Sequence, residues 1–147
     1  MKWKVLAVGK PALAYARAGI DEYSSRLKHY APVEIQYLKD AGSVDKNGEC
    51  LLAASEGCLR LVLDERGKSL TTTKLVDWVK ARALDGTVKQ IAVLIGGADG
   101  HSDEVRAQAD VMFNLSRLTL QHELALVTFL EQLYRVHTII RGEPYHR

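Results

Sequence analysis

The sequence has few cysteines and no long apolar run, and each absence excludes a class of protein. Only Cys50 and Cys58 occur among its 147 residues, without the cysteine or histidine neighbours of a zinc site. We interpret them as reduced thiols and expect no metal. No stretch approaches the ~20 apolar residues that cross a bilayer. The apolar start is too short for a signal peptide, so we expect a cytoplasmic protein with no membrane partner.

The chain also lacks a strong excess of charge. Its net charge is +2, with 47% hydrophobic and 26% charged residues, which are ordinary values for a globular protein. Disordered chains, collagen-like repeats and coiled coils are thereby excluded. The length fits one domain, spanning residues 1–147. So mild a positive charge permits an RNA partner without arguing for one, so any basic footprint has to be local.

Segments typical of strands and of helices alternate along the whole chain. Strands are predicted at residues 3–8, 33–37, 59–63, 91–95 and 111–115, and helices at 13–27, 49–54, 75–84, 124–136 and after the N-cap Ser102. A flexible loop is predicted over 39–48 and a turn over 64–68. This alternation predicts an α/β fold, with a mainly parallel sheet and flanking helices.

Two of these segments are apolar on more than one side. Residues 91–95 are wholly apolar, which indicates a strand covered on both faces of a parallel sheet. Residues 124–136 are apolar around most of the helix, and burial against a second subunit would explain this. Within that helix Glu131 needs a partner if it is buried, and Arg135, four residues later, is well placed to provide one.

Three glycines follow the apolar strand, in the pattern Gly96-Gly97-x-x-Gly100. Glycine allows close approach of the backbone to a ligand, and it equally serves a tight strand-to-helix turn. Spacing alone leaves both interpretations open. The pattern is neither a dinucleotide-binding fingerprint nor a phosphate-binding loop, which disfavours a nucleotide-dependent oxidoreductase.

The C-terminal tail concentrates positive charge and ends in Pro144-Tyr145-His146-Arg147. Its basic and histidine residues are Arg135, His137, Arg141, His146 and Arg147, with Glu143 as the one acid among them. Such a tail can hold phosphates and stack on a base, whereas the alternative is an ordinary solvated terminus. We interpret His122 as a helix cap or core residue. No local Ser-His-Asp or Cys-His set is present.

Several blocks in this order closely resemble one family. They are the opening 5–10 and 21–23, Leu63 to Lys68, Ile95 to Gly100, Leu115 to His122, Glu131 to Arg135 and the terminal Pro144 to Arg147. The chain resembles, from end to end, the minimal bacterial SPOUT-class methyltransferases, which methylate N3 of a pseudouridine in large-subunit (23S) ribosomal RNA.

The resemblance implies a SPOUT fold with a deep trefoil knot in the C-terminal half, an exception to the rule that chains do not thread loops. It implies a homodimer with active sites at the subunit interface, and S-adenosylmethionine as the cofactor. Carried over residue by residue, the cofactor-binding residues are Leu63, Gly96, Leu115, Ser116, Arg117, Leu118, Thr119 and Leu120.

The implied reaction moves a methyl group from a sulfonium to an imide nitrogen, which must first lose its proton. We expect His146 to be the base and Tyr145 a stacking or orienting group. Arg147 and Arg135 would stabilise charge or anchor phosphates. A protein this small offers little surface with which to read an RNA site by itself, so we expect it to recognise a large assembled surface. The expected partner is large-subunit ribosomal RNA within the assembled ribosome.

The chain departs from the family pattern at Gln121, where proline is usual, and at Leu126, where arginine is usual. Loss of that arginine is expected to remove a cation that faces RNA or the dimer interface. The chain also looks short between Tyr37 and Glu49. The alternatives are a drifted, non-catalytic ribosome-binding protein and a SPOUT methyltransferase acting on another RNA.

Overall fold

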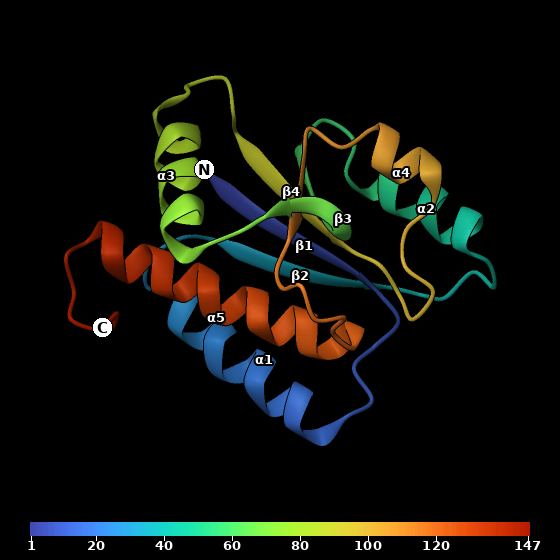
Figure 1. Ribbon diagram of the computed structural model, residues 1–147, viewed down its shortest axis with the longest axis horizontal. Helices are drawn as coiled ribbons and strands as arrows, with labels where there is room; N and C mark the ends of the chain where they lie inside the picture. Colours follow the sequence, from blue (N-terminus) through green and yellow to red (C-terminus); the bar gives the residue numbers. More distant parts are fainter.

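The computed structural model describes residues 1–147 and contains one five-stranded sheet with helices on both faces (Figure 1). The strands are β1 (Lys2–Val8), β2 (Val33–Leu38), β3 (Leu59–Ser69), β4 (Gln90–Ile95) and β5 (Val111–Asn114). Their order across the sheet is β2-β1-β4-β3-β5, and every neighbouring pair is parallel. The predicted α/β class with a parallel sheet is confirmed.

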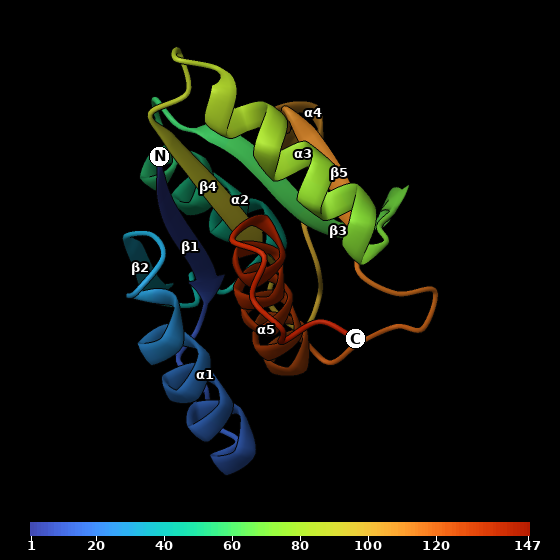
Figure 2. The ribbon, with the colours of Figure 1, turned by 90° about the vertical axis from the view of Figure 1, so that its left-hand side faces the viewer.

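Five helices form two layers. They are α1 (Ala14–Leu27), α2 (Val44–Ala54), α3 (Thr72–Leu84), α4 (Asp103–Ala107) and α5 (His122–Ile140). Helices α1, α3 and α5 pack their apolar side chains into the larger core, on one face of the sheet. Helices α2 and α4 pack on the opposite face, so the sheet is sandwiched between the two layers (Figures 1 and 2). None of the helices has the length and apolar character needed to span a bilayer.

The central strands are buried on both faces because their side chains alternate between the two cores. In β1, Val5 packs with the larger core and Leu6 with the smaller one. The same alternation in β4 sends Val93 to one side and Leu94 to the other, each without exposed surface. The prediction for residues 91–95 is therefore confirmed.

The predicted turn over residues 64–68 is wrong, because β3 continues through it to Ser69. Leu63 and Lys68 both lie opposite Phe113 of β5, so the residues between them bulge out of the ladder. At Gly67 a Cβ atom would come within 2.6 Å of the Phe113 backbone. Only glycine therefore allows the bulged strand to pass so close to its neighbour.

The predicted loop over residues 39–48 is also too long. Helix α2 begins at Val44, because the Ser43 hydroxyl accepts a hydrogen bond from the Lys46 amide and caps the helix. At α4, Ser102 performs the same role for Val105, as predicted.

Helix α5 is longer than predicted, starting at His122 and ending at Ile140. The cap belongs to Gln121 and not to His122: the Gln121 side chain accepts hydrogen bonds from the amides of Glu123 and Leu124. The Glu123 carboxylate in turn accepts from the Ala12 and Leu13 amides, which fixes the start of α1 against the start of α5. These bonds from the backbone of Leu13 and Ala12 outweigh the effect of burial and lower the pKa of Glu123.

Leu126 is 2% exposed and belongs to the larger core. The leucine therefore contributes to the packing of α5 on the sheet. The effect of the missing arginine on RNA or dimer contacts stays a prediction. The trefoil knot stays a prediction.

Candidate functional site

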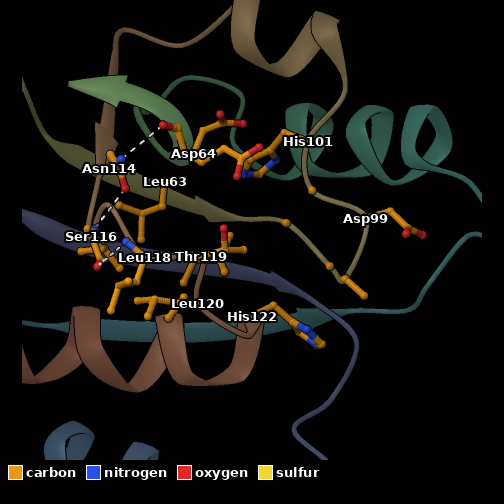
Figure 3. Close-up of a pocket in the computed structure, with 18 of the residues that line it drawn as sticks. Leu63, Asp64, Asp99, His101, Asn114, Ser116, Leu118, Thr119, Leu120 and His122 are labelled. Atoms are coloured by element: carbon orange, nitrogen blue, oxygen red, sulfur yellow. Dashed lines mark hydrogen bonds between the residues drawn. The ribbon is translucent and has the colours of Figure 1, made fainter. Parts of the chain in front are cut away.

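A pocket of about 380 Å³ opens at the carboxyl ends of β3, β4 and β5. We call it the carboxyl-edge pocket. Three segments line it, from Leu63 to Glu65, from Ile95 to His101 and from Asn114 to Leu120 apart from Arg117, and Arg106, His122 and Ala125 complete it (Figure 3). Parallel α/β sheets bind ligands at this edge, and the volume suits a small molecule.

Most of the predicted cofactor-binding residues meet in this pocket. Those that line it are Leu63, Gly96, Leu115, Ser116, Leu118, Thr119 and Leu120. Arg117 does not line it, although it lies in the same segment, and it is exposed to solvent. Residues from three distant parts of the sequence are thus brought to one place.

The glycine cluster forms a tight turn that is also a wall of the pocket. The Gly100 amide donates to the Gly97 carbonyl at 3.0 Å, and Gly100 adopts a φ of 77°. A Cβ at Gly96 would stand 2.8 Å from the Gly100 backbone. The tight-turn interpretation is therefore confirmed, and because the same backbone lines the pocket, a ligand-binding role for the glycines stays a prediction.

A buried ion pair lies in the pocket wall. Asp64, whose side chain is 3% exposed, accepts a hydrogen bond from the Arg106 guanidinium at 2.9 Å. Burial acts to raise the pKa of Asp64, but hydrogen bonds from the Arg66 amide and from Arg106 outweigh it and lower the pKa. This pair ties the bulge of β3 to α4.

His101 lies beside this pair and is 5% exposed. Its Nε2 atom is 3.2 Å from the Leu94 carbonyl, which can only accept, so Nε2 carries the proton. Burial lowers the pKa of His101 more than the nearby Asp64 carboxylate raises it. The ring is therefore neutral at physiological pH and acts as an uncharged part of the pocket wall.

The third lining segment is shaped by side chains that hydrogen-bond to the backbone. Asn114 accepts from the Ser116 amide at 3.0 Å and donates to the Glu65 carbonyl at 3.2 Å (Figure 3). Ser116 accepts from the Leu118 amide at 3.0 Å. These bonds turn the chain after β5 back over the pocket and leave Leu118 77% exposed. An apolar side chain so exposed at a pocket rim can cover a ligand ring or contact a second chain.

The predicted catalytic residues gather elsewhere, around Glu131. Its carboxylate accepts hydrogen bonds from Arg135 at 2.6 Å and from the Tyr145 hydroxyl at 3.0 Å. The Arg135 guanidinium also lies 4.7 Å above the Tyr145 ring and donates to Nδ1 of His146 at 3.1 Å. We call these four residues the tail cluster. The predicted Glu131–Arg135 pairing is confirmed, and Arg147 is exposed without a hydrogen-bonded partner.

The contacts of the tail cluster indicate the tautomer of His146 and the protonation state of Tyr145. A guanidinium can only donate, so Nδ1 of His146 accepts and the proton of the neutral ring is on Nε2. Burial, together with the hydrogen bond to Glu131, raises the pKa of Tyr145 to about 12. Tyr145 is therefore a neutral phenol at physiological pH.

The pocket borders the start of α5, whereas the tail cluster packs against the second half of the helix. His122 borders the pocket at the first residue, Glu131 follows nine residues later and Arg135 thirteen residues later. At 1.5 Å per residue, Glu131 and Arg135 are about 14 and 20 Å from His122 along the axis. The C-terminus accordingly lies at the far end of α5 from the segment after β5 (Figure 1). Within one chain, these two groups of residues do not form a single site.

Sequence reasoning missed the polar wall of the pocket. Asp64, His101, Arg106 and Asn114 all line it and were not predicted as site residues. The position of Asp64, directly after the buried part of a strand, was a usable signal, because strand ends meet at the ligand-binding edge. No group of three or more His, Cys, Asp or Glu side chains lies close enough to hold a metal ion.

Comparison with known proteins identifies the family. A family model described as a predicted SPOUT methyltransferase matches residues 1–146. Proteins named ribosomal RNA large subunit methyltransferase H are similar over the full chain. The one from Thermus thermophilus is 48% identical over 147 residues, and the one from Deinococcus radiodurans is 42% identical; each alignment covers 100% of this chain and 99% of the relative.

Two solved structures have a similar fold. One is a tRNA (m1G37) methyltransferase from Aquifex aeolicus, with a TM-score of 0.57 and 14% identity, covering 100% of this chain and 75% of that one. The other is a probable methylase family protein from Haemophilus influenzae, with a TM-score of 0.56 and 12% identity, covering 99% and 70%. At such identities these structures support the fold alone. With the family model and the full-length relatives, the conclusion is that the chain belongs to the SPOUT methyltransferase family.

Proposed function

We propose that this protein is an S-adenosylmethionine-dependent methyltransferase that methylates N3 of a pseudouridine in the RNA of the large ribosomal subunit. The relatives named above support the substrate and the reaction. The observation that carries the proposal is the carboxyl-edge pocket, where three segments distant in sequence converge on a cavity that suits a cofactor.

The residues of the pocket fit this cofactor. Leu63, Leu115 and Leu118 offer apolar side chains for the adenine ring, and the Gly96–Gly100 turn offers backbone groups. Asp64, Glu65 and Asp99 line the pocket against the single cation Arg106, which leaves an excess of negative charge there. When bound, S-adenosylmethionine supplies a methyl group on a positively charged sulfur, which a negative wall favours.

The chemistry requires removal of the proton from N3 of the pseudouridine. The imide nitrogen has no free lone pair until that proton leaves, so a base has to accept it. We assign His146 as the base, and Arg147 and Arg135 as cations that favour the resulting anion. Tyr145, a neutral phenol, would stack on or orient the pseudouridine ring. With the cofactor bound, the electron pair freed at N3 would accept the methyl carbon, and the sulfur would keep the electron pair of the carbon–sulfur bond.

In the free chain, the Nδ1 lone pair of His146 is occupied by the hydrogen bond from Arg135. Proton transfer to Nδ1 therefore requires that this contact open, so that Arg135 and His146 can turn to the substrate. We infer that the tail cluster is the resting arrangement of the tail.

Because the pocket and the tail cluster are separated along α5, we propose that the protein acts as a homodimer. The tail of one protomer would complete the pocket of its partner, as a two-fold interface allows. The exposed Leu118 at the pocket rim is an apolar surface for such an interface. A C-terminal knot would hold the lining segments of the pocket together.

We place the reaction in the cytoplasm, on ribosomal RNA within the assembled ribosome. A chain of 147 residues with a net charge of +2 offers little surface with which to read an RNA sequence alone. A large preformed surface would supply the rest of the recognition. Comparable methylation rates on intact ribosomes and on a short stem-loop would contradict this part of the proposal.

The test begins with titration of the purified protein with S-adenosylmethionine, with its mass in solution recorded on the same sample. Micromolar binding to a dimer is expected. Ribosomes from a strain without the modification are then incubated with protein and isotope-labelled cofactor, and the labelled nucleoside is identified by mass spectrometry. Label in N3-methylpseudouridine is expected. Cofactor binding without any label on ribosomal RNA would favour the drifted ribosome-binding alternative.

A further inference from the structure

A second cavity lies at the opposite edge of the sheet from the carboxyl-edge pocket. It measures about 480 Å³ and is bounded by the amino ends of β1, β2 and β4 and by the connection from α1 to β2. We call it the amino-edge hollow. Lys2, Lys28, His29, Tyr30 and Glu34 are among the residues that line it. No step of the proposed reaction uses it.

The amino-edge hollow concentrates positive charge. Lys2 and Lys28 contribute two permanent cations and His29 a titratable ring, against the single carboxylate of Glu34. Both lysines are exposed, and neither side chain has a hydrogen-bond or ion-pair partner in the protein. In a chain whose net charge is only +2, this is a local basic surface with its cations free to bind an anion.

The hollow is physically continuous with the C-terminal tail. The Tyr30 hydroxyl donates to the Glu143 carboxylate, and Arg141 donates to the His29 carbonyl at 3.2 Å. The Arg141 guanidinium also lies 4.5 Å above the Tyr30 ring. The wall of the hollow therefore anchors the residues shortly before Tyr145, and Arg141 and Glu143 add one cation and one carboxylate at its border.

We propose that the amino-edge hollow binds the sugar–phosphate backbone of ribosomal RNA beside the nucleotide that receives the methyl group. The inference rests on the proposed function, because it assigns an RNA surface to the same reaction. Unpaired lysines around an open hollow match the spaced negative charges of an RNA strand. The anchored tail then extends from this phosphate-binding surface toward the nucleotide that receives the methyl group, so that one stretch of RNA contacts both the hollow and the tail.

The test compares two charge-reversed variants of the full-length protein. The first is Lys2→Glu with Lys28→Glu, which changes the hollow. The control is Lys39→Glu with Lys46→Glu, which makes the same change of charge at two exposed lysines beyond the opposite end of β2. None of the four side chains makes a hydrogen bond or ion pair, so all variants are expected to fold and to bind S-adenosylmethionine as the wild type does.

The measured quantities are KM and kcat for methylation of ribosomes, and the salt dependence of binding. For the hollow variant, KM for ribosomes is expected to rise about ten-fold or more, and the slope of log affinity against log salt to fall by about two. The control is expected to stay within about two-fold of wild type in KM, and kcat should change little in either.

Equal KM values for the hollow variant and the wild type would overturn the inference while leaving the proposed function intact. Equal losses in the two variants would also overturn it, because the effect would then be one of overall charge. A wild-type protein that methylates no ribosomal RNA would overturn the proposed function and the inference with it.

Discussion

The start of α5 and its second half border two groups of residues that are built in different ways. At the start, the carboxyl-edge pocket is formed by segments that belong to or follow three strands. Along the second half, the tail cluster is held by hydrogen bonds among side chains near the surface. A pocket fixed by the fold is suited to bind a cofactor, whereas a tail held by a few side-chain bonds can be released. Under the proposed function, separate parts of the chain would contribute cofactor binding and catalysis, and these parts would meet between protomers.

A substitution in the C-terminal tail has the largest expected effect. His146→Ala is expected to lower the methylation rate on ribosomes by about 100-fold or more, because it removes the proposed base. The affinity for S-adenosylmethionine, titrated on the same variant, should stay within about two-fold of wild type. An unchanged methylation rate would contradict the role of His146, and a lost cofactor affinity would contradict the separation of the two regions.

A substitution in the carboxyl-edge pocket should instead lower the affinity for the cofactor. Gly96→Ala is expected to weaken the binding of S-adenosylmethionine about ten-fold or more, because the added Cβ would meet the Gly100 backbone at 2.8 Å and distort the turn. Gly86→Ala is the control, since nothing lies within 4 Å of a Cβ there. Titration calorimetry of both variants measures the effect. If both bind the cofactor as the wild type does, the turn is not part of the binding site.

The Asp64–Arg106 ion pair allows a test of whether the pocket wall is stabilised by the fold itself. Asp64→Asn is expected to lower the free energy of unfolding by about 1–2 kcal/mol at pH 7, since it removes an ionic hydrogen bond from Arg106. The pKa of Asp64 is lowered in the folded protein, so this stabilisation is present above the ordinary aspartate pKa and is lost as the pH falls through the lowered value. The measurement is denaturant unfolding at neutral and acidic pH.

Asp103→Asn is the control for that variant, because Asp103 pairs with the same Arg106 but its side chain is 97% exposed. Asp103→Asn should lower the free energy of unfolding only slightly at either pH. Equal stability of the two variants at pH 7 would show that the buried pair contributes nothing beyond an exposed one.

The smallest expected effect concerns the bonds that hold the tail. Glu131→Gln is expected to lower the pKa of Tyr145 from about 12, because a charged acceptor for its hydroxyl is lost, while burial keeps the pKa above its ordinary value. Absorbance titration of tyrosine, with Tyr145→Phe to assign the signal, measures it. Glu143→Gln is the control, since that carboxylate binds Tyr30 instead. An unchanged Tyr145 titration in Glu131→Gln would contradict the tail cluster.

Local sequence patterns were enough for much of the fold. The apolar run at 91–95 predicted a strand buried on both faces, and Ser102 predicted the start of a helix. The Glu131–Arg135 pair followed from the four-residue spacing of a helix. Each of these features depends on residues close together in the chain, which is why a pattern could predict it.

The features that were missed depend on residues far apart in sequence. The bulge at 64–67 exists because β3 pairs twice with Phe113, about fifty residues later, and no local pattern contains that pairing. The Asp64–Arg106 pair and the burial of Leu126 likewise arise only when distant elements pack. The glycine cluster stayed ambiguous because a turn and a ligand-facing wall require the same residues.

Under the proposed function, the pocket of one protomer works with the tail of the other. The most direct test is to mix equal amounts of Gly96→Ala and His146→Ala protein under conditions that exchange subunits, and to measure methylation of ribosomes. If the tail acts on the partner's pocket, the mixture should recover about a quarter of the wild-type rate, since half of the dimers are mixed and each of those has one intact site. A mixture no more active than the separate variants would contradict the account.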